Sequence, residues 1–122
     1  MSQKEINPKI EWCNVKNNNC LKFTFNGTLT KDDAVKATAQ WREYLSPDNI
    51  NNVNIVWECT NMTGYEPMAR SVWQSALKDL KSKIACIWLI TESRLIKTGA
   101  QLMSVFTSYN FKVVNSEDKI EF

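Results

Sequence analysis

Histidine is absent from the 122-residue sequence, and glycine and proline each occur only three times. Without histidine, a cysteine nucleophile has no imidazole base, and a zinc site would have to be built from thiolates alone. Gly27, Gly64 and Gly99 are too scattered to form a glycine-rich phosphate loop. We therefore expect no catalytic residue, no enzymatic activity and no cofactor.

The four cysteines, Cys13, Cys20, Cys59 and Cys86, lie far apart in the sequence, and no two of them form a Cys-x-x-Cys pair. Each falls in a segment that we expect to be a strand, so all four thiolates are not expected to converge on one metal ion. We interpret them as reduced, buried thiols with a structural role, and we expect no metal site.

Charge of one sign is not concentrated anywhere in the chain. The 15 basic and 13 acidic residues are spread along it and give a net charge of +2. A nucleic-acid-binding face would need a basic stripe, so no nucleic-acid partner is expected. No apolar run approaches the ~20 residues of a membrane-spanning helix. The polar start has no apolar segment behind it, as a signal peptide would. We expect a cytoplasmic protein without stable membrane insertion.

The segment Ile84–Ile90 is a continuous run of seven uncharged, mostly apolar residues, in which β-branched and aromatic side chains are prominent. A continuous run of this kind indicates a strand buried on both faces, as in the centre of a parallel or mixed sheet. Apolar residues make up 43% and charged residues 23% of the sequence, which is typical of one globular domain. We expect this domain to span residues 1–122, with polar tails at residues 1–8 and 115–122.

Hydrophobic periodicity predicts the other elements of the chain. The predicted strands are residues 10–15, 20–26, 53–59 and 111–114, and the predicted helices are residues 30–45, 67–80 and 94–109. Turns are expected at residues 17–19 and at Asn26-Gly27, and a loop at residues 60–66. Thr30 is expected to cap the first helix, whose first turn holds Asp32 and Asp33.

The predicted order is therefore β-β-α-β-α-β-α-β, an α/β fold with an N-terminal antiparallel hairpin. Right-handed crossovers place all three helices on one face of the mixed sheet. The other face is then either partly wet or covered by another segment. In the second helix Met68 is expected on the core face and Arg70 away from it. In the third helix the expected core-facing set is Leu95, Ile96, Gly99, Leu102, Met103 and Phe106.

Two segments resemble the STAS domain, the fold of bacterial anti-sigma factor antagonists such as SpoIIAA. Residues 25–30, Phe-Asn-Gly-Thr-Leu-Thr, are similar to that family's strand, glycine and short step into the first helix. Residues 53–59, followed by a loop and a helix from Pro67, match the next strand and helix. The resemblance covers about residues 10–114 and rests mainly on element order and length. It implies a STAS-like (SpoIIAA-like) fold and a non-enzymatic regulatory module with a protein partner, such as a kinase or an anti-sigma factor.

The family's antagonists carry a phosphorylated serine at the start of the second helix, whereas this sequence has Gly64-Tyr65-Glu66-Pro67. Thr60 and Thr63 are the nearest preceding hydroxyls and are the candidate phosphorylation sites. Glu66 is expected either to provide a fixed negative charge at the helix N-terminus or simply to cap that helix.

Ligands of open α/β sheets bind beyond the carboxyl ends of the strands. Two polar segments meet this rule, one before the second helix and one at the start of the third. Together they form the predicted contact surface for a partner or ligand: Thr60, Asn61, Thr63, Gly64, Tyr65, Glu66, Ser93, Arg94 and Lys97.

Two alternatives to the regulatory module remain open. The SpoIIAA-like fold also resembles that of the CRAL-TRIO lipid carriers, which implies a binder or carrier of a small apolar ligand. The third helix, apolar over more than one stripe, is compatible with deep burial, with the face of a homodimer or with the lid of a cavity. The tryptophans either fill the core or line an aromatic pocket: Trp12, Trp41, Trp57, Trp73 and Trp88.

Overall fold

Five strands and three helices follow one another in the predicted order, in a computed structural model that describes residues 6–109 and 111–122, the side chains of Val105 and Phe106 excepted. The elements are β1 (Lys9–Val15), β2 (Asn18–Leu29), α1 (Lys31–Leu45), β3 (Val53–Tyr65), α2 (Pro67–Asp79), β4 (Ile84–Ile90), α3 (Arg94–Thr107) and β5 (Phe111–Val114). Short 3-10 turns, η1 (Lys81–Lys83) and η2 (Glu117–Lys119), precede β4 and follow β5. No helix in the described part of the chain is long and apolar enough to cross a membrane.

The strands form one sheet in sequence order, β1-β2-β3-β4-β5. Strand β1 pairs with β2 in antiparallel fashion, and the other three pairings are parallel, so the predicted hairpin and mixed sheet are confirmed. The apolar run Ile84–Ile90 forms β4, which lies inside the sheet between β3 and β5. The middle position belongs to β3, however, and only residues 87–90 of β4 are fully buried.

The hairpin turn and the first helix start as their residues dictate. The turn is at Lys16-Asn17, where both φ angles are positive (49° and 66°), one residue earlier than expected. Asparagine tolerates that conformation, which matches the twist of a tight hairpin. Thr30 caps α1 as predicted: its Oγ1 accepts from the Asp33 amide at 3.1 Å, and Asp33 Oδ2 accepts from the Thr30 amide at 3.1 Å.

Two of the predicted irregular segments are strand instead. Residues 60–66 were expected to form a loop, but β3 continues to Tyr65, and Asn26-Gly27 lies within β2 rather than in a turn. The extensions pair with each other: Asn26 lies opposite Asn61, and Leu29 opposite Tyr65. Register shifts on both sides of Gly27, whose φ is +61°, accommodate the glycine within the strand. Bulges of this kind use residues that locally favour turns, which explains the error.

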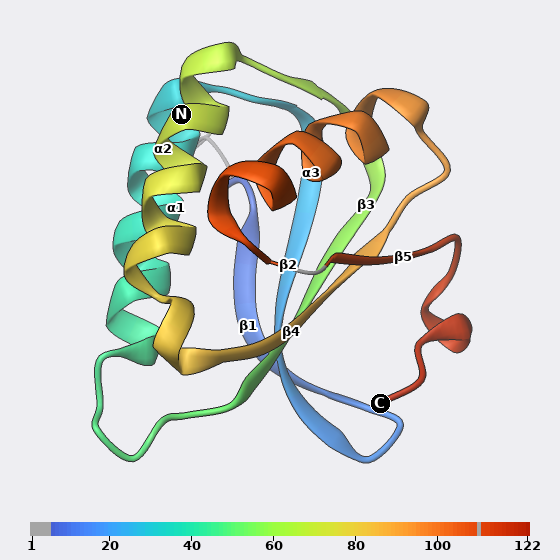
Figure 1. The fold of residues 1–122 in the computed structure, drawn as a ribbon. Coiled ribbons are helices and arrows are strands. Elements are labelled where there is room, and N and C mark those ends of the chain that lie inside the picture. Colours follow the sequence, from blue (N-terminus) through green and yellow to red (C-terminus); the bar gives the residue numbers. More distant parts are fainter. Residues whose placement is uncertain (1–5, 110) are drawn as a thin grey trace, which may run out of the picture.

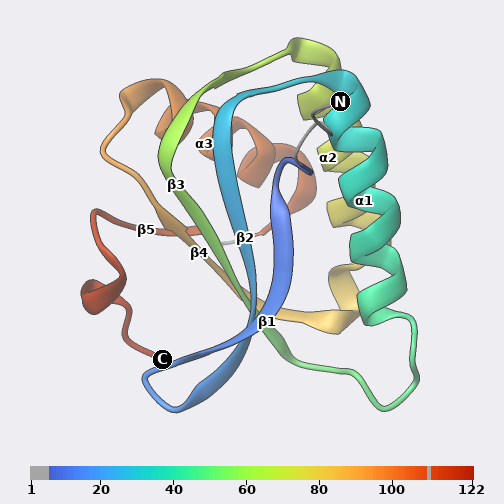
Figure 2. The same cartoon turned by 180° about the vertical axis from the view of Figure 1, so that it is seen from behind.

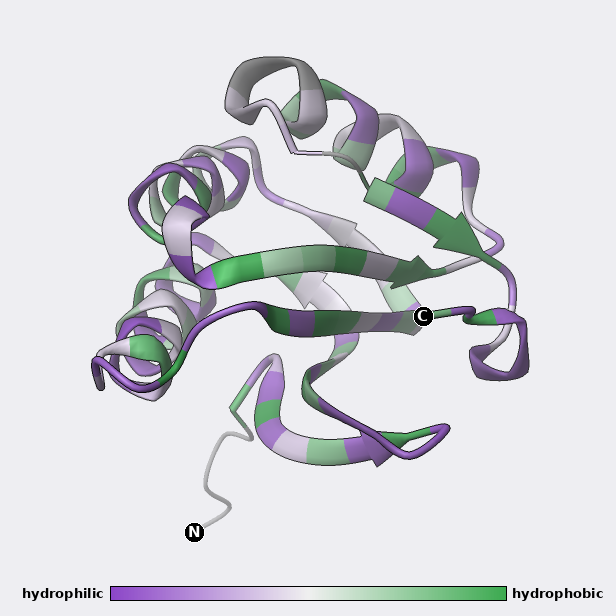
Figure 3. Ribbon diagram, turned by 60° about the horizontal axis from the view of Figure 1, so that its bottom comes forward, coloured by the Kyte–Doolittle hydropathy of each residue, from purple (hydrophilic) through white to green (hydrophobic). Residues whose placement is uncertain are grey.

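All three helices pack against one face of the sheet, as predicted, and α1 and α2 lie side by side in Figures 1 and 2. Their coils alternate between hydrophobic and hydrophilic residues in Figure 3, as expected for helices with one face on a core. Aromatic rings fill the centre of the core between the sheet and the helices. The rings of Phe23 and Trp41 pack edge to face, with their centroids 5.1 Å apart. Four of the five tryptophans are buried, and Trp12, on the edge strand, is 38% exposed.

Some helix residues face differently from the expectation. In α3 the side turned to the sheet holds Ile96, Gly99, Ala100 and Met103, whereas Leu95 and Leu102 are 54% and 40% exposed. An apolar pattern wider than one stripe does not define which part faces the core, so this placement was wrong. Met68, in the first turn of α2, is also exposed rather than in the core. The Phe106 side chain lies outside the described residues.

The opposite face of the sheet is covered in part by the C-terminal segment, which lies away from α1 and α2 (Figures 1 and 2). Ile120 is fully buried there, against Val56 and Trp88 among others. Lys16 Nζ donates to the carbonyls of Asp118 (2.7 Å) and Ile120 (2.6 Å), which fastens the segment to the hairpin. Residues 115–122, predicted as a polar tail, are mostly exposed, but Ile120 and the two Lys16 hydrogen bonds anchor the segment to the sheet.

Candidate functional site

A cavity of about 50 Å³, partly open to the surface, lies between the sheet and helices α2 and α3. The sheet contributes Phe25 and Leu89, from the carboxyl-terminal halves of β2 and β4, and Trp57 from the first half of β3. The helices contribute Trp73 from α2 and Met103 from α3, among others. The surface that these side chains expose to the cavity is apolar. Two of the five tryptophans thus line a pocket, in agreement with the aromatic-pocket alternative, and the others do not.

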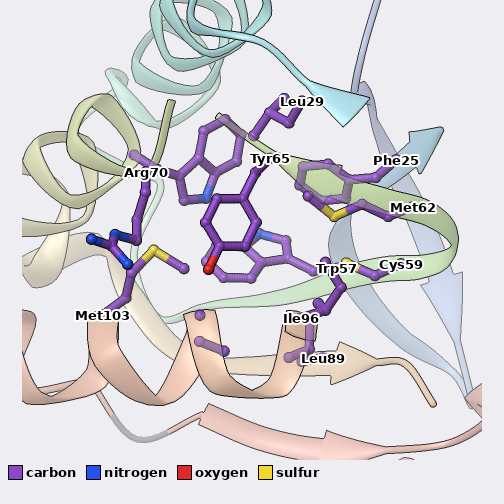
Figure 4. A pocket seen from close by; sticks show the side chains of 13 residues that line it. Phe25, Leu29, Trp57, Cys59, Met62, Tyr65, Arg70, Leu89, Ile96 and Met103 are labelled. Atoms are coloured by element: carbon purple, nitrogen blue, oxygen red, sulfur yellow. The ribbon is translucent and has the colours of Figure 1, made fainter. Parts of the chain in front are cut away.

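Tyr65, the last residue of β3, reaches across the cavity to α3 (Figure 4). Helix α3 admits the ring because it has a glycine at the contact: a Cβ on Gly99 would lie 2.6 Å from Tyr65 Oη and 2.9 Å from two ring carbons. Gly99 therefore serves close packing and not a turn. Tyr65 is half-buried, and rotation of this one side chain would change the size of the opening.

Arg70 also lines the cavity, one turn into α2, where its side chain is half-buried. It lies beside Met103 at one end of the site, and Phe25 and Met62 lie at the other (Figure 4). Arg70 was predicted to lie away from the core face, so its place in the cavity lining was missed. A charged residue beside an apolar stripe is usually solvated, so the helical pattern alone holds no signal for it.

Trp57 contributes a buried polar atom to the wall of the cavity. The side chain is 2% exposed, and its indole Nε1 has no hydrogen-bond partner among the described residues. Trp41 Nε1 is also buried without a described partner, but Trp41 does not line the cavity. Nearly all buried N–H groups in proteins have a partner, so each exception requires an explanation.

Of the two roles expected for Glu66, capping of α2 by its side chain is wrong, whereas its charge does lie at the N-terminus of a helix. Glu66 is the N-cap residue of α2, but its side chain makes no capping hydrogen bond there. Its carboxylate accepts instead from the backbone amide of Lys31, the first residue of α1, at 2.7 Å. The Glu66 amide donates to the Leu29 carbonyl at 2.9 Å. Because β2 and β3 end side by side, the residue that precedes α2 satisfies a free amide at the start of α1.

The other predicted residues before α2 lie on the end of β3. Thr60, Asn61 and Thr63 are exposed, and Gly64 is buried. Thr60 donates its hydroxyl hydrogen to the Glu58 carboxylate, and the Thr63 hydroxyl lies 3.5 Å from that of Thr28. Of this group only Tyr65 lines the cavity.

The predicted residues around the start of α3 are close by but outside the cavity lining. Ser93 caps the helix: its Oγ accepts from the Ile96 amide at 3.3 Å. Arg94 and Lys97 are exposed, and Ile96 between them turns into the cavity. A Cβ on Gly64 would lie 3.8 Å from Leu95 Cδ2, so the two predicted segments are neighbours at one edge of the sheet.

No cluster of metal-binding side chains occurs within the part of the chain that the structure describes. Cys59, the one cysteine that lines the cavity, is buried, and burial raises the pKa of its thiol far above the ordinary value of 9.0. A thiol held in its neutral form is a poor nucleophile. The site therefore offers an apolar wall without a reactive nucleophile, an arrangement suited to binding an apolar group.

A mixed five-stranded sheet with an N-terminal hairpin and three helices on one face is the SpoIIAA-like fold. No protein-family model and no curated protein matches the sequence. Among solved structures, an uncharacterized protein of the DUF3478 family with a SpoIIAA-like fold, from Shewanella loihica, superposes with a TM-score of 0.76. The match covers 97% of this chain and 94% of that chain at 17% sequence identity, and it confirms the predicted fold.

Proposed function

We propose that the protein binds a small apolar ligand in the cavity between the sheet and helices α2 and α3. The observation that carries this proposal is the cavity itself: about 50 Å³, apolar, partly open and at the carboxyl ends of parallel strands. This is the place where open α/β sheets bind ligands. The volume is several times the ~10–15 Å³ that one water molecule needs.

A simple packing defect is a weaker explanation. Protein interiors contain few voids larger than a water molecule. An apolar wall does not hold water well, because water needs two to four polar partners. A ligand that removes the wall from water gains about 25 cal/mol for each Å² of apolar surface buried. Rotation of Tyr65 provides a way in.

The test uses a neutral apolar probe, 1-hexanol, titrated into the protein and followed by Trp57 and Trp73 fluorescence and by amide chemical shifts. Ala100, 2% exposed on α3, lines the cavity, so Ala100→Leu fills it. We expect saturable binding to the wild-type protein and its loss in the filled variant. Ala39→Leu, on the exposed side of α1, is the matched control and should bind normally. Leu29→Phe fills the cavity from the sheet side if Ala100→Leu proves unstable. Equal binding by wild-type protein and both filled variants would contradict the proposal.

A second candidate function is that of a regulatory protein-interaction module, with a protein partner or a second copy of the chain. It is supported by exposed apolar side chains beside the predicted contact surface: Met68 is 55% and Leu95 54% exposed. Exposed apolar side chains that gather into a patch are typical of contact surfaces. The exposed hydroxyls of Thr60 and Thr63 lie on the same end of the sheet and are the candidate phosphorylation sites.

Sedimentation of the wild-type protein and of a Met68→Ser, Leu95→Ser variant tests the self-association form of this candidate. We expect a dimer that the double variant converts to a monomer. A wild-type monomer over the whole concentration range would restrict the module to other partners. Cross-linking with Tyr65→Ala, Glu66→Ala and Arg94→Ala variants would then map their contact.

A further inference from the structure

The guanidinium of Arg70 is available for a ligand. Across the described residues three ion pairs are present, Lys9–Glu11, Lys22–Glu117 and Arg42–Asp79, and none involves Arg70. Its guanidinium also has no hydrogen-bond partner there. A guanidinium is always charged in proteins, and partial burial removes part of its hydration without supplying acceptors. An anion bound here would supply hydrogen-bond acceptors in place of the water that burial removes from the guanidinium.

The natural partner of Arg70 within its own helix is engaged elsewhere. Glu66 lies four residues earlier, at the spacing that favours an ion pair on one helix face. Its carboxylate is instead held by the Lys31 amide at the start of α1, at 2.7 Å. Within the described residues, this contact leaves the Arg70 charge without a partner at the edge of an apolar cavity.

The other polar groups around the cavity are donors as well. Trp57 Nε1 can only donate, and it has no partner within the described residues. Tyr65 Oη, against Gly99, also has no described hydrogen-bond partner. The Tyr65 ring lies across the cavity in Figure 4, so its rotation is what would give a ligand access to the indole N–H. One permanent cation and two neutral donors favour a ligand that brings acceptor atoms and negative charge.

We propose that the ligand is a monocarboxylate with a short aliphatic or single-ring tail. This inference rests on the proposed function and names the ligand class of the same site. Arg70 binds the carboxylate, because a guanidinium matches its two oxygens with paired hydrogen bonds. The tail lies among Phe25, Trp57 and Ile96, and the cavity of about 50 Å³ limits its size.

The experiment compares hexanoate with 1-hexanol, which have tails of equal length, by calorimetric titration in a buffer free of carboxylate and phosphate. Arg70→Met removes the proposed anchor, and Arg94→Met removes the same charge from an exposed position outside the lining. We expect hexanoate to bind the wild-type protein about tenfold more tightly than hexanol, the usual scale of a charge-assisted hydrogen bond. Arg70→Met should abolish this difference and leave hexanol binding intact, and Arg94→Met should preserve it.

Other outcomes separate the ligand class from the cavity. Equal affinity of the wild-type protein for hexanoate and hexanol overturns the carboxylate inference and leaves apolar binding standing. The same is true if Arg94→Met weakens hexanoate binding as much as Arg70→Met does. Tighter binding of hexylamine than of hexanoate also overturns it. If no probe binds, both the inference and the proposed function fail.

Discussion

The carboxylate of Glu66 accepts a hydrogen bond from the backbone amide of Lys31 at 2.7 Å, although the two residues are 35 positions apart and open different helices. One side chain thereby ties the start of α1 to the junction of β3 and α2. The same contact engages the Glu66 carboxylate, so that it does not pair with Arg70, which lines the cavity.

Replacement of Glu66 by alanine should lower the free energy of unfolding by about 1 kcal/mol, because α1 loses both an acceptor for a free amide and a negative charge at its N-terminus. Glu66→Gln keeps an acceptor and should lose less. Urea unfolding at low and high salt measures both effects, and the charge-dependent part should shrink in salt. Glu43→Ala, an exposed acidic residue near the end of α1, is the control and should change little. Equal losses of unfolding free energy in Glu43→Ala and Glu66→Ala would show that the contact of Glu66 with the Lys31 amide does not stabilise the protein.

Gly99→Ala should destabilise the protein, because a Cβ there would lie 2.6 Å from Tyr65 Oη. The ring has to move, and overpacking of this kind costs about 1–3 kcal/mol. In a Tyr65→Ala background the same substitution should instead stabilise by about 0.5–1 kcal/mol, because alanine is the better helix former. Urea unfolding of the four proteins in this double-mutant cycle checks the reversal of sign.

Gly64→Ala is the control for this cycle. Apart from its two chain neighbours, its Cβ would meet only Leu95 Cδ2, at an ordinary contact distance of 3.8 Å, so Gly64→Ala should not cause overpacking. If Gly99→Ala has the same effect with and without the tyrosine ring, Tyr65 does not depend on the glycine for its position.

How well the sequence predicted each part depends on how local the cause is. The sequence predicted the bounds of two strands to the residue, β4 (Ile84–Ile90) and β5 (Phe111–Val114). In both cases the cause is local, an apolar run or a neighbouring turn. The Thr30 cap was also predicted, because its partner is three residues away. Residues 60–65 were missed as strand, since only pairing with β2 explains them.

The candidate site shows the same division. Tyr65 was part of the predicted contact surface, because it belongs to a polar segment that was expected to follow a strand, and it lines the cavity. Arg70 was missed, because its role depends on Glu66 being engaged by another helix and on the apolar wall supplied by three strands. A single isoleucine in a polar segment, Ile120, likewise has no periodic signal, yet it is fully buried.

Ile120→Ala should lower the free energy of unfolding by about 2 kcal/mol or more, the usual cost of removing a buried isoleucine side chain. It should also release the C-terminal segment from the sheet, which limited proteolysis and the fluorescence of Trp88 would report. Lys16→Met, which removes the donors to the Asp118 and Ile120 carbonyls, should release the segment with a smaller loss. Glu121→Ala, exposed beside Ile120, is the control. Unchanged proteolysis in both test variants would show that the segment is not held by these contacts.

The stability of the protein should fall as the pH rises above 9. Burial raises the pKa of the Cys59 thiol above its ordinary value of 9.0 and that of the Tyr109 hydroxyl above 10.0. In the folded protein both groups therefore stay protonated at pH values where they ionise in the unfolded chain. The unfolded state then binds fewer protons, so stability is fully present below pH 9 and decreases above it.

Urea unfolding between pH 7 and 11 measures this slope in three proteins. Cys59→Ala should flatten the decrease that begins near pH 9, whatever its effect on stability at pH 7. Tyr109→Phe should flatten the part that begins near pH 10, although it also removes the hydrogen bond of 2.7 Å from Tyr109 Oη to the Leu77 carbonyl. The test compares the slope of the free energy of unfolding against pH, and not its absolute value, because that slope counts the protons released on unfolding. A slope between pH 9 and 10 that is the same in Cys59→Ala and in the wild-type protein would show that Cys59 is not the group that ionises on unfolding.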